Sequence, residues 1–195
     1  TIGLDFFRND FTNQVIVDLE NPRQVQFYNL NGNSFSNSFQ AELNATPFKK
    51  LDIRLAYRYF DVQQTYTGQL KSRPFISKHR AFASVDYATE KDWKFNYTLT
   101  YNGPKRIPST ASNPSIYQFE SVSPDFVLMN AQISKTVGKS KNMDFYMGVE
   151  NITNTFQDNL IIATDMPFSN FFDASMIWGP TNGRMLYFGW RFKIK

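Results

Sequence analysis

The chain ends with the stretch Gly183-Arg184-Met185-Leu186-Tyr187-Phe188-Gly189-Trp190-Arg191-Phe192-Lys193-Ile194-Lys195. From residue 186 every even position is large and apolar, whereas most odd positions are small, polar or charged. A period of two over this length predicts a β-strand with one apolar face and one polar face. A strand of about a dozen residues is also long enough to cross a bilayer at a tilt. The stretch therefore predicts a transmembrane strand.

Seven other segments alternate in the same way. We expect strands over residues 2–19 (with a bulge near 8–10), 35–46, 51–59, 78–88, 93–102, 125–137 and 143–151. The connections after the second, fourth and sixth of these strands are short, and the other connections are long. Loop 20–33, for example, contains the turn dipeptides Asn21-Pro22 and Asn31-Gly32.

This alternation of connection lengths is typical of a transmembrane barrel, whose turns are short on the periplasmic side and whose loops are long on the extracellular side. The sequence therefore predicts an all-β fold, namely an antiparallel transmembrane β-barrel section of about eight strands. The last strand would run inward, which would leave Lys195 in the periplasm.

Composition excludes several classes of site. The chain has 195 residues and no cysteine, so it has neither disulfides nor thiolate chemistry, and its one histidine, His79, excludes the usual histidine-rich metal sites. The net charge of +4 is spread along the chain, which argues against nucleic acid as a partner. The chain contains no run of 18 apolar residues, so no membrane helix is predicted. The 20 Phe, 10 Tyr and 3 Trp suit strands and the aromatic girdles of membrane barrels.

Charged residues on the predicted polar faces have two readings. The carboxylates could form a catalytic pair, but we expect them to pair with arginines and lysines inside a wet lumen. The residues concerned are Asp5, Glu42, Asp86, Asp144 and Glu150, with Arg54, Arg58, Arg80, Lys94 and Arg191 as expected partners. His79 lies at a loop-to-strand junction, where a solvated surface role is commoner than haem ligation. We therefore predict no enzyme, no metal site and no cofactor.

Three stretches resemble the barrels of TonB-dependent outer-membrane receptors, and they occur in the family's order. Residues 5–15 resemble its Phe-Tyr-x-x-Phe-x-Asp-x-Ile strand. Residues 148–154 resemble its Gly-Val-x-Asn-Leu-Phe-Asn run, with Thr153 in place of the aromatic residue. Residues 184–195 resemble its final strand, which is also the signal for the outer-membrane assembly machinery. Gly189, Phe192 and Ile194 fit that signal, although the chain ends on Lys195 rather than on an aromatic residue.

The resemblance implies the rest of the receptor. Family barrels have 22 strands around an N-terminal plug, so residues 1–195 would be a single barrel portion near the end, with the plug and earlier strands absent. The chain would provide wall and loops for the TonB-driven uptake of a ferric siderophore, haem or cobalamin into a bacterium. Implied partners are outer-membrane lipid, lipopolysaccharide and, through the absent plug, TonB; a surface lipoprotein is a further candidate.

The long loops are the best candidates for substrate contact, because function concentrates on loops held by a rigid scaffold. The aromatic candidates in them are Tyr117, Phe119, Phe168, Phe171, Phe172 and Trp178. An alternative is that these side chains pack loop against loop or against lipopolysaccharide. A second alternative concerns the whole chain, which could be a complete eight-stranded barrel with a structural or adhesive role. In that barrel, the strand near Leu4 would pair with the strand near Phe188.

Overall fold

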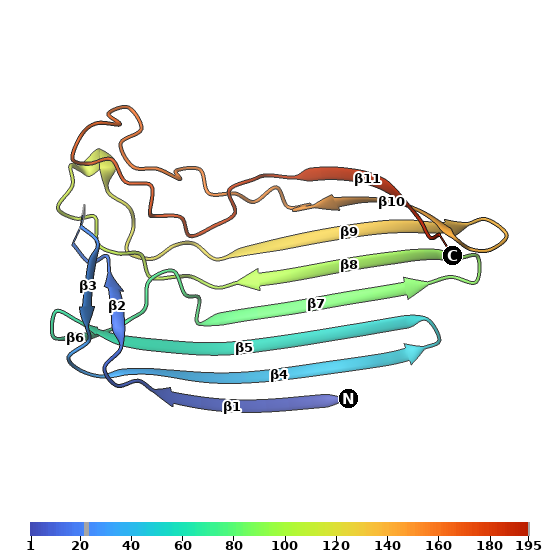
Figure 1. Ribbon diagram of the computed structural model, residues 1–195, viewed down its shortest axis with the longest axis horizontal. Coiled ribbons are helices and arrows are strands. Elements are labelled where there is room, and N and C mark those ends of the chain that lie inside the picture. Colours follow the sequence, from blue (N-terminus) through green and yellow to red (C-terminus); the bar gives the residue numbers. More distant parts are fainter. Residues whose placement is uncertain (22–23, 195) are drawn as a thin grey trace.

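One antiparallel sheet dominates the computed structural model, which describes residues 1–21 and 24–194. Its strands follow one another along a single path: β1 (Ile2–Asp10), β4 (Ser34–Phe48), β5 (Leu51–Tyr66), β7 (His79–Ala88), β8 (Trp93–Asn102), β9 (Phe126–Val137), β10 (Met143–Glu150) and β11 (Met185–Phe192). The long connections gather at one end of the sheet, and the short turns and both termini lie at the other (Figure 1). We name these the long-loop end and the short-turn end. The predicted all-β antiparallel order is confirmed.

Four small elements lie at the long-loop end (Figure 1). They are the hairpin of β2 (Val15–Asp18) and β3 (Gln26–Asn29), the strand β6 (Gln69–Ser72), which folds back on β5, and a 3-10 turn, η1 (Ser115–Tyr117). Across the described residues, no helix is long and apolar enough to cross a membrane.

The first predicted strand, over residues 2–19, is wrong in its second half. The pattern slips at residues 8–10 because the chain leaves the main sheet after Asp10, rather than because of a bulge. It turns through Asn13, which has a positive φ of 55°, and forms β2. The predicted loop 20–33 then contains β3, while Pro22 of the expected Asn21-Pro22 turn lies outside the described residues.

The strand predicted over 51–59 continues to Tyr66. Its extra residues are stabilised by the β2–β3 hairpin, since Tyr66 is buried with Ile16 and Leu30 in a small core. The period-of-two pattern of apolar side chains therefore ends before the strand does, because the last part of β5 packs against protein on one side.

The two faces of the sheet differ sharply in chemistry. On β11 the exposed fractions are 81% for Leu186 and 90% for Phe188, and on β1 at the other edge they are 74% for Ile2 and 67% for Leu4. The polar face instead carries residues such as Gln40, whose neighbours in register are also polar. Monomeric soluble proteins rarely expose so much contiguous apolar surface, so this face is suited to hydrocarbon.

The sheet is open. Strands β1 and β11 stand at its two ends, and they do not pair with each other in residues 1–21 and 24–194. The ladder between Leu4 and Phe188 that a closed eight-stranded barrel requires is therefore not formed. Each end strand presents one free row of backbone hydrogen-bonding groups, and such edges need a partner inside a membrane.

The last hairpin is closely packed on its polar face. Tyr146 lies opposite Gly189, and Tyr187 lies opposite Gly148, and each ring covers the glycine where a side chain would begin. The two rings are 6.3 Å apart, and the Tyr187 hydroxyl donates to Gln132 Oε1 at 2.9 Å. Gly189 of the predicted assembly signal therefore also makes room for an aromatic ring. Phe192 ends β11, and Ile194 follows it with its side chain exposed.

Candidate functional site

The long loops are joined by a hydrophobic core of their own. Residues 103–124 and 152–184 contribute its buried members, which are Ile107, Tyr117, Ile162, Ala163 and Met176. Isolated β-bridges add order to this cluster: Ser77 pairs with Lys105, Arg106 with Val122, and Ile162 with Asp173. The loops at this end therefore form one packed body, which we name the loop cluster.

The six predicted contact residues separate into two groups. Tyr117 is buried, donates from its hydroxyl to Asp165 Oδ2 at 2.7 Å and stacks on Phe171 at 5.9 Å. Phe119 and Trp178 are partly buried against the same core. Phe168 is completely exposed, and Phe172 is 40% exposed. The loop cluster therefore uses four of the predicted residues for packing between loops and leaves Phe168 and Phe172 at the surface.

A hollow of about 220 Å³ opens beside that core. Phe119 and Trp178 line it together with polar groups that include Glu120, Asp158 and Asn159. Aromatic walls with a few polar groups are the usual chemistry of a small-molecule pocket. The hollow alone is too small for a bulky nutrient.

Gln157 fixes the shape of the longest loop. Its side chain is 3% exposed and bonds to backbone on both arms of segment 152–184. Oε1 accepts from the N–H groups of Trp178 and Gly179 at 2.9 and 3.1 Å. Nε2 donates to the carbonyls of Asn159 and Met176 at 2.7 and 3.0 Å. One buried amide thus satisfies four backbone groups, which holds Trp178 against the core.

The motif residue Asn151 closes the base of the same loop. It has a positive φ of 52°, and its Nδ2 donates to the carbonyls of Thr155 and Asn182 at 2.7 and 3.1 Å. Asn154 Oδ1 accepts from the N–H of Arg184 at 2.9 Å. The two asparagines of the run 148–154 therefore join the exit from β10 to the entry into β11, which gives that motif a structural role.

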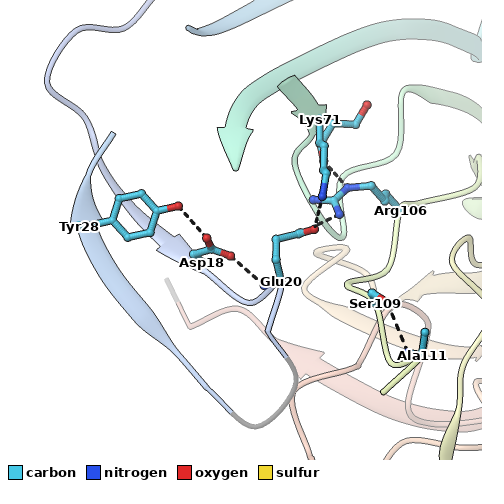
Figure 2. Close-up of polar contacts among 8 residues, drawn as sticks. Asp18, Glu20, Tyr28, Lys71, Arg106, Ser109 and Ala111 are labelled. Carbon is cyan, nitrogen blue, oxygen red and sulfur yellow. Dashed lines mark hydrogen bonds and ion pairs between the residues drawn. The ribbon is translucent and has the colours of Figure 1, made fainter. Parts of the chain in front are cut away.

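An ion-pair cluster ties the β2–β3 hairpin to the other loops (Figure 2). The Glu20 carboxylate lies 2.7 Å from Arg106 Nη1 and 3.3 Å from Lys71 Nζ. Arg106 Nε donates to the Ser72 carbonyl at 2.5 Å, and its guanidinium stacks over the Tyr66 ring at 5.4 Å. The side chain of Glu20 is only 10% exposed. Since Glu20, Lys71 and Arg106 come from three successive long connections, this cluster orders the long-loop end as a unit.

A second carboxylate holds the hairpin itself. Asp18 accepts from the Tyr28 hydroxyl at 2.6 Å and from the N–H of Glu20 at 2.8 Å, as Figure 2 shows. The pKa of Tyr28 is raised to about 12, chiefly by burial and secondly by the hydrogen bond to Asp18. The neutral phenol is therefore the form that the folded hairpin favours.

This pKa predicts a loss of hairpin stability in alkali. A tyrosine in an unfolded chain titrates near pH 10, so the contribution of Tyr28 is fully present below about pH 10 and is lost as the pH rises through about 12. Tyrosinate absorption measured for the wild type minus that of Tyr28→Phe should give one titration with a midpoint near 12. A midpoint near 10 would show that the hydroxyl is free.

The sequence missed the hairpin and its acidic residues. A usable signal was present, since the β-branched run Val15-Ile16-Val17 and the run Gln26-Phe27-Tyr28 flank a turn dipeptide. The contacts of Glu20 could not be found in this way, because Lys71 and Arg106 are distant in sequence. Among the described residues, no three His, Asp or Glu side chains are placed to hold a metal ion.

Comparison with known structures gives the fold. The ferric enterobactin receptor PfeA of Pseudomonas aeruginosa, as a mutant in complex with enterobactin, matches with a TM-score of 0.69 at 16% identity over 98% of this chain and 29% of that one. The copper transporter OprC matches with a TM-score of 0.71 at 14% identity over 99% and 29%. The ferric-catecholate import receptor Fiu of E. coli K12 matches with a TM-score of 0.63 at 13% identity over 97% and 25%.

The chain thus spans less than a third of the length of each of these structures. No curated protein sequence matches it. The family model described as TonB dependent receptor-like, beta-barrel matches residues 1–152, which is most of the chain. Together with the open, two-faced sheet and its long-loop end, this match shows that the chain belongs to the TonB-dependent receptor β-barrel family.

Proposed function

We propose that residues 1–195 form the last part of the wall, and the attached loops, of an outer-membrane transporter that takes up a bulky nutrient with energy from TonB. The observation that carries the proposal is the packed loop cluster at one end of a sheet whose apolar face is uncovered. A rigid wall that holds ordered loops is suited to capturing a solute from outside and passing it inward, and it needs no catalytic group.

The same asymmetry supports the orientation that we propose. The long-loop end faces the cell exterior and lipopolysaccharide, and the short-turn end with the C-terminus faces the periplasm. Strand β11 with Gly189, Phe192 and Ile194 serves as the assembly signal. The remaining strands and the plug that contacts TonB belong to parts of the receptor outside residues 1–195, in keeping with the share of the solved receptors that the chain covers.

The candidate nutrients are a ferric siderophore, haem or cobalamin. PfeA in complex with enterobactin supports the first of these, and the copper transporter OprC adds a metal ion to the range. Phe168 and Phe172, as exposed aromatics on the loop cluster, would make the first contact. A lipoprotein at the cell surface could bind over these same loops.

Uptake in cells tests the proposal. The intact receptor is expressed in a strain that lacks its own receptors, and iron chelates, haem and cobalamin are each offered as the limiting nutrient. Growth on one of them should require both the receptor and TonB. Growth that is equal with and without TonB would assign the chain to a passive channel and overturn the proposal.

The membrane placement predicts a contrast between neighbouring residues of β8. Leu99 lies on the apolar face between Ala83 and Met129, and Thr98 lies on the polar face. Leu99→Arg puts a charge into hydrocarbon and should cost about 2–4 kcal/mol of folding free energy. Thr98→Arg puts the same side chain into the lumen and should be tolerated. Unfolding by urea in lipid vesicles measures both, and equal effects would contradict the assignment of faces.

A further inference from the structure

A lysine stands among aromatic side chains on the apolar face, close to the short-turn end. Lys135 of β9 lies opposite Trp93 of β8 and Phe145 of β10, and Phe145 in turn lies opposite Trp190 of β11. The three rings are exposed, as aromatic rings are at the edge of the hydrocarbon. We name these four residues the interfacial row. A lysine in such a row extends its ammonium out of the hydrocarbon toward the lipid headgroups.

The charge of Lys135 is not neutralised by the residues that the structure describes. Its ammonium lies 5.1 Å from the centre of the Trp93 ring and donates to the carbonyl of Lys91, in the turn between β7 and β8. It forms no ion pair within 1–21 and 24–194, where the carboxylate of Asp92 is held by Lys141 at 2.8 Å. An ammonium has three donors. Lys135 therefore retains donors for an anion that approaches from the membrane.

Further lysines lie around the same turn. Lys50 pairs with Glu90 at 2.7 Å, just as Lys141 pairs with Asp92. The hydrogen bond from Lys141 lowers the pKa of Asp92 most, and the nearby charges of Lys135 and Lys50 lower it further. Both carboxylates of the turn thus already have a lysine partner, and the positive charge of Lys135 remains in excess.

The other end of the same face is balanced in charge. Beyond the apolar part of β1, Arg8 pairs with Asp10 at 2.8 Å. Beyond the apolar part of β5, Asp61 pairs with Lys78, also at 2.8 Å. The excess of positive charge on the membrane-facing side is therefore a feature of the short-turn end near β8 and β9.

A groove of about 420 Å³ lies on the apolar face beside the interfacial row. Its lining includes Tyr97, Ala131, Ile133 and Met147. Ala131 lies opposite Tyr97, and Ile133 lies opposite Met147, so the small side chain of Ala131 leaves a depression among larger ones. Lys135 follows Ile133 by two positions and projects from the same face of β9. The groove therefore leads along the strand to a cation.

We propose that this groove and Lys135 bind one anionic phospholipid of the periplasmic leaflet, with an acyl chain over Ala131 and the headgroup phosphate at the ammonium. Charge complementarity calls for an anion and the groove for a hydrocarbon chain, and a phospholipid supplies both in one molecule. The lysine excess favours a headgroup with net negative charge over a zwitterionic one. The inference goes beyond transport, but it rests on the proposed orientation of the short-turn end.

Quenching of Trp93 fluorescence by brominated lipids tests the site, because bromine quenches an indole only at close range. The intact receptor is reconstituted in mixtures of phosphatidylglycerol and phosphatidylcholine in which one or the other lipid is brominated. Subtracting the signal of Trp93→Phe isolates this ring. Phosphatidylglycerol should occupy the site with roughly fivefold higher affinity than phosphatidylcholine. Raised salt should reduce this preference.

The polar face supplies a matched control for the charge. The sequence predicted that Lys94 pairs with a carboxylate there. Of the pairs expected across that face, only Arg54 with Glu42, at 3.5 Å, forms among the described residues, and Arg58 instead lies opposite Arg80. The predicted pairing of Lys94, Arg58 and Arg80 is therefore wrong. Lys94→Gln thus removes a charge next to Trp93 in sequence but on the lumenal side, and it should leave the lipid preference unchanged.

Variants on the apolar face should change lipid binding in two ways. Lys135→Gln should bring the affinities for the two lipids close together, whereas Lys135→Arg should keep the preference because it keeps the charge. Ala131→Leu fills the groove with an apolar side chain that the bilayer tolerates, so the barrel should still fold. It should displace the acyl chain and lower the quenching of Trp93 by both lipids.

Three results would overturn the proposal. Equal quenching by the two lipids in the wild type would leave the lysines to an acidic partner in the periplasm. A preference that survives in Lys135→Gln, or one that is also lost in Lys94→Gln, would assign it to the overall charge of the receptor.

The orientation is tested separately in cells with Ser140→Cys, in the turn between β9 and β10. A maleimide that cannot cross the outer membrane should label this variant, relative to the wild type, only after the membrane is permeabilised. Labelling of intact cells would refute the assignment to the periplasmic leaflet. Failure of TonB-dependent growth on every nutrient would instead refute the transporter function, and it would leave the lipid measurements in vesicles unaffected.

Discussion

Replacing Gly148 with alanine should destabilise the last hairpin by about 1–3 kcal/mol, and valine should cost more. A Cβ at this position would meet the Tyr187 ring and, at 2.9 Å, the carbonyl oxygen of Ala131. The ring can rotate away, but the carbonyl belongs to the ladder between β9 and β10, where Val149 pairs with Ala131. Relief therefore requires that backbone hydrogen bonds be strained. The melting temperature of the intact receptor in detergent measures the effect.

Second variants show which contact is responsible. At Gly189 the three nearest neighbours of a Cβ are all atoms of the Tyr146 side chain, so Tyr146→Ala should rescue Gly189→Ala. Tyr187→Ala should rescue Gly148→Ala only in part, because the Ala131 carbonyl remains. Gly3→Ala in β1 is the control, since a Cβ there meets nothing within 4 Å. Full rescue at both glycines would show that the backbone contact does not matter.

The wall could be predicted from the sequence because its signal is local. In β11 the alternation of residue types alone assigns each side chain to a face: Leu186 and Phe188 lie on the apolar face, and Tyr187 lies on the polar face. No other segment is needed to predict this pattern. The same reasoning failed where protein replaces lipid on one side. Ile16 and Tyr66 are buried against each other, so neither the end of β5 nor the β2–β3 hairpin showed the membrane pattern.

The candidate site was harder to predict from the sequence, because it depends on contacts between residues that are distant in sequence. The predicted aromatic residues do lie in long connections, but nothing in the sequence separates Tyr117, whose hydroxyl bonds to Asp165 at 48 positions' distance, from the exposed Phe168. The ion pairs were equally hard to predict from the sequence. The opposition of Arg58 and Arg80 depends on the register between β5 and β7, which is fixed only when the strands pair.

Replacing the buried amide of Gln157 should strongly destabilise the loop formed by residues 152–184. Gln157→Leu keeps approximately the same volume but leaves two N–H groups and two carbonyls of the 152–184 segment without their partner. Each buried backbone group that loses its hydrogen bond costs about 1–3 kcal/mol unless water reaches it. Three of these four contacts are only partly buried, so water replaces part of the loss, and we expect the ordered conformation of this loop to lose about 2–4 kcal/mol. Hydrogen exchange should then become faster in peptides that cover residues 157–179.

A smaller change tests whether the N–H donors of the Gln157 amide hold the loop. Gln157→Glu keeps the acceptor for the Trp178 and Gly179 N–H groups, but it turns a second oxygen toward the carbonyls of Asn159 and Met176, which repel it. It should be as harmful as leucine at neutral pH, and it should recover in acid once the carboxyl is protonated and can donate. Gln69→Glu on strand β6, where the side chain is exposed and the residue opposite is Tyr66, is the matched control and should change little. Strands β7 to β10 should keep their slow exchange in every variant, because the wall does not depend on this loop.

If Gln157→Glu exchanged as slowly as the wild type at neutral pH, the donors of Gln157 would not hold the loop. Trp178 would then owe its position to the retained acceptor for its N–H group and to the hydrophobic core.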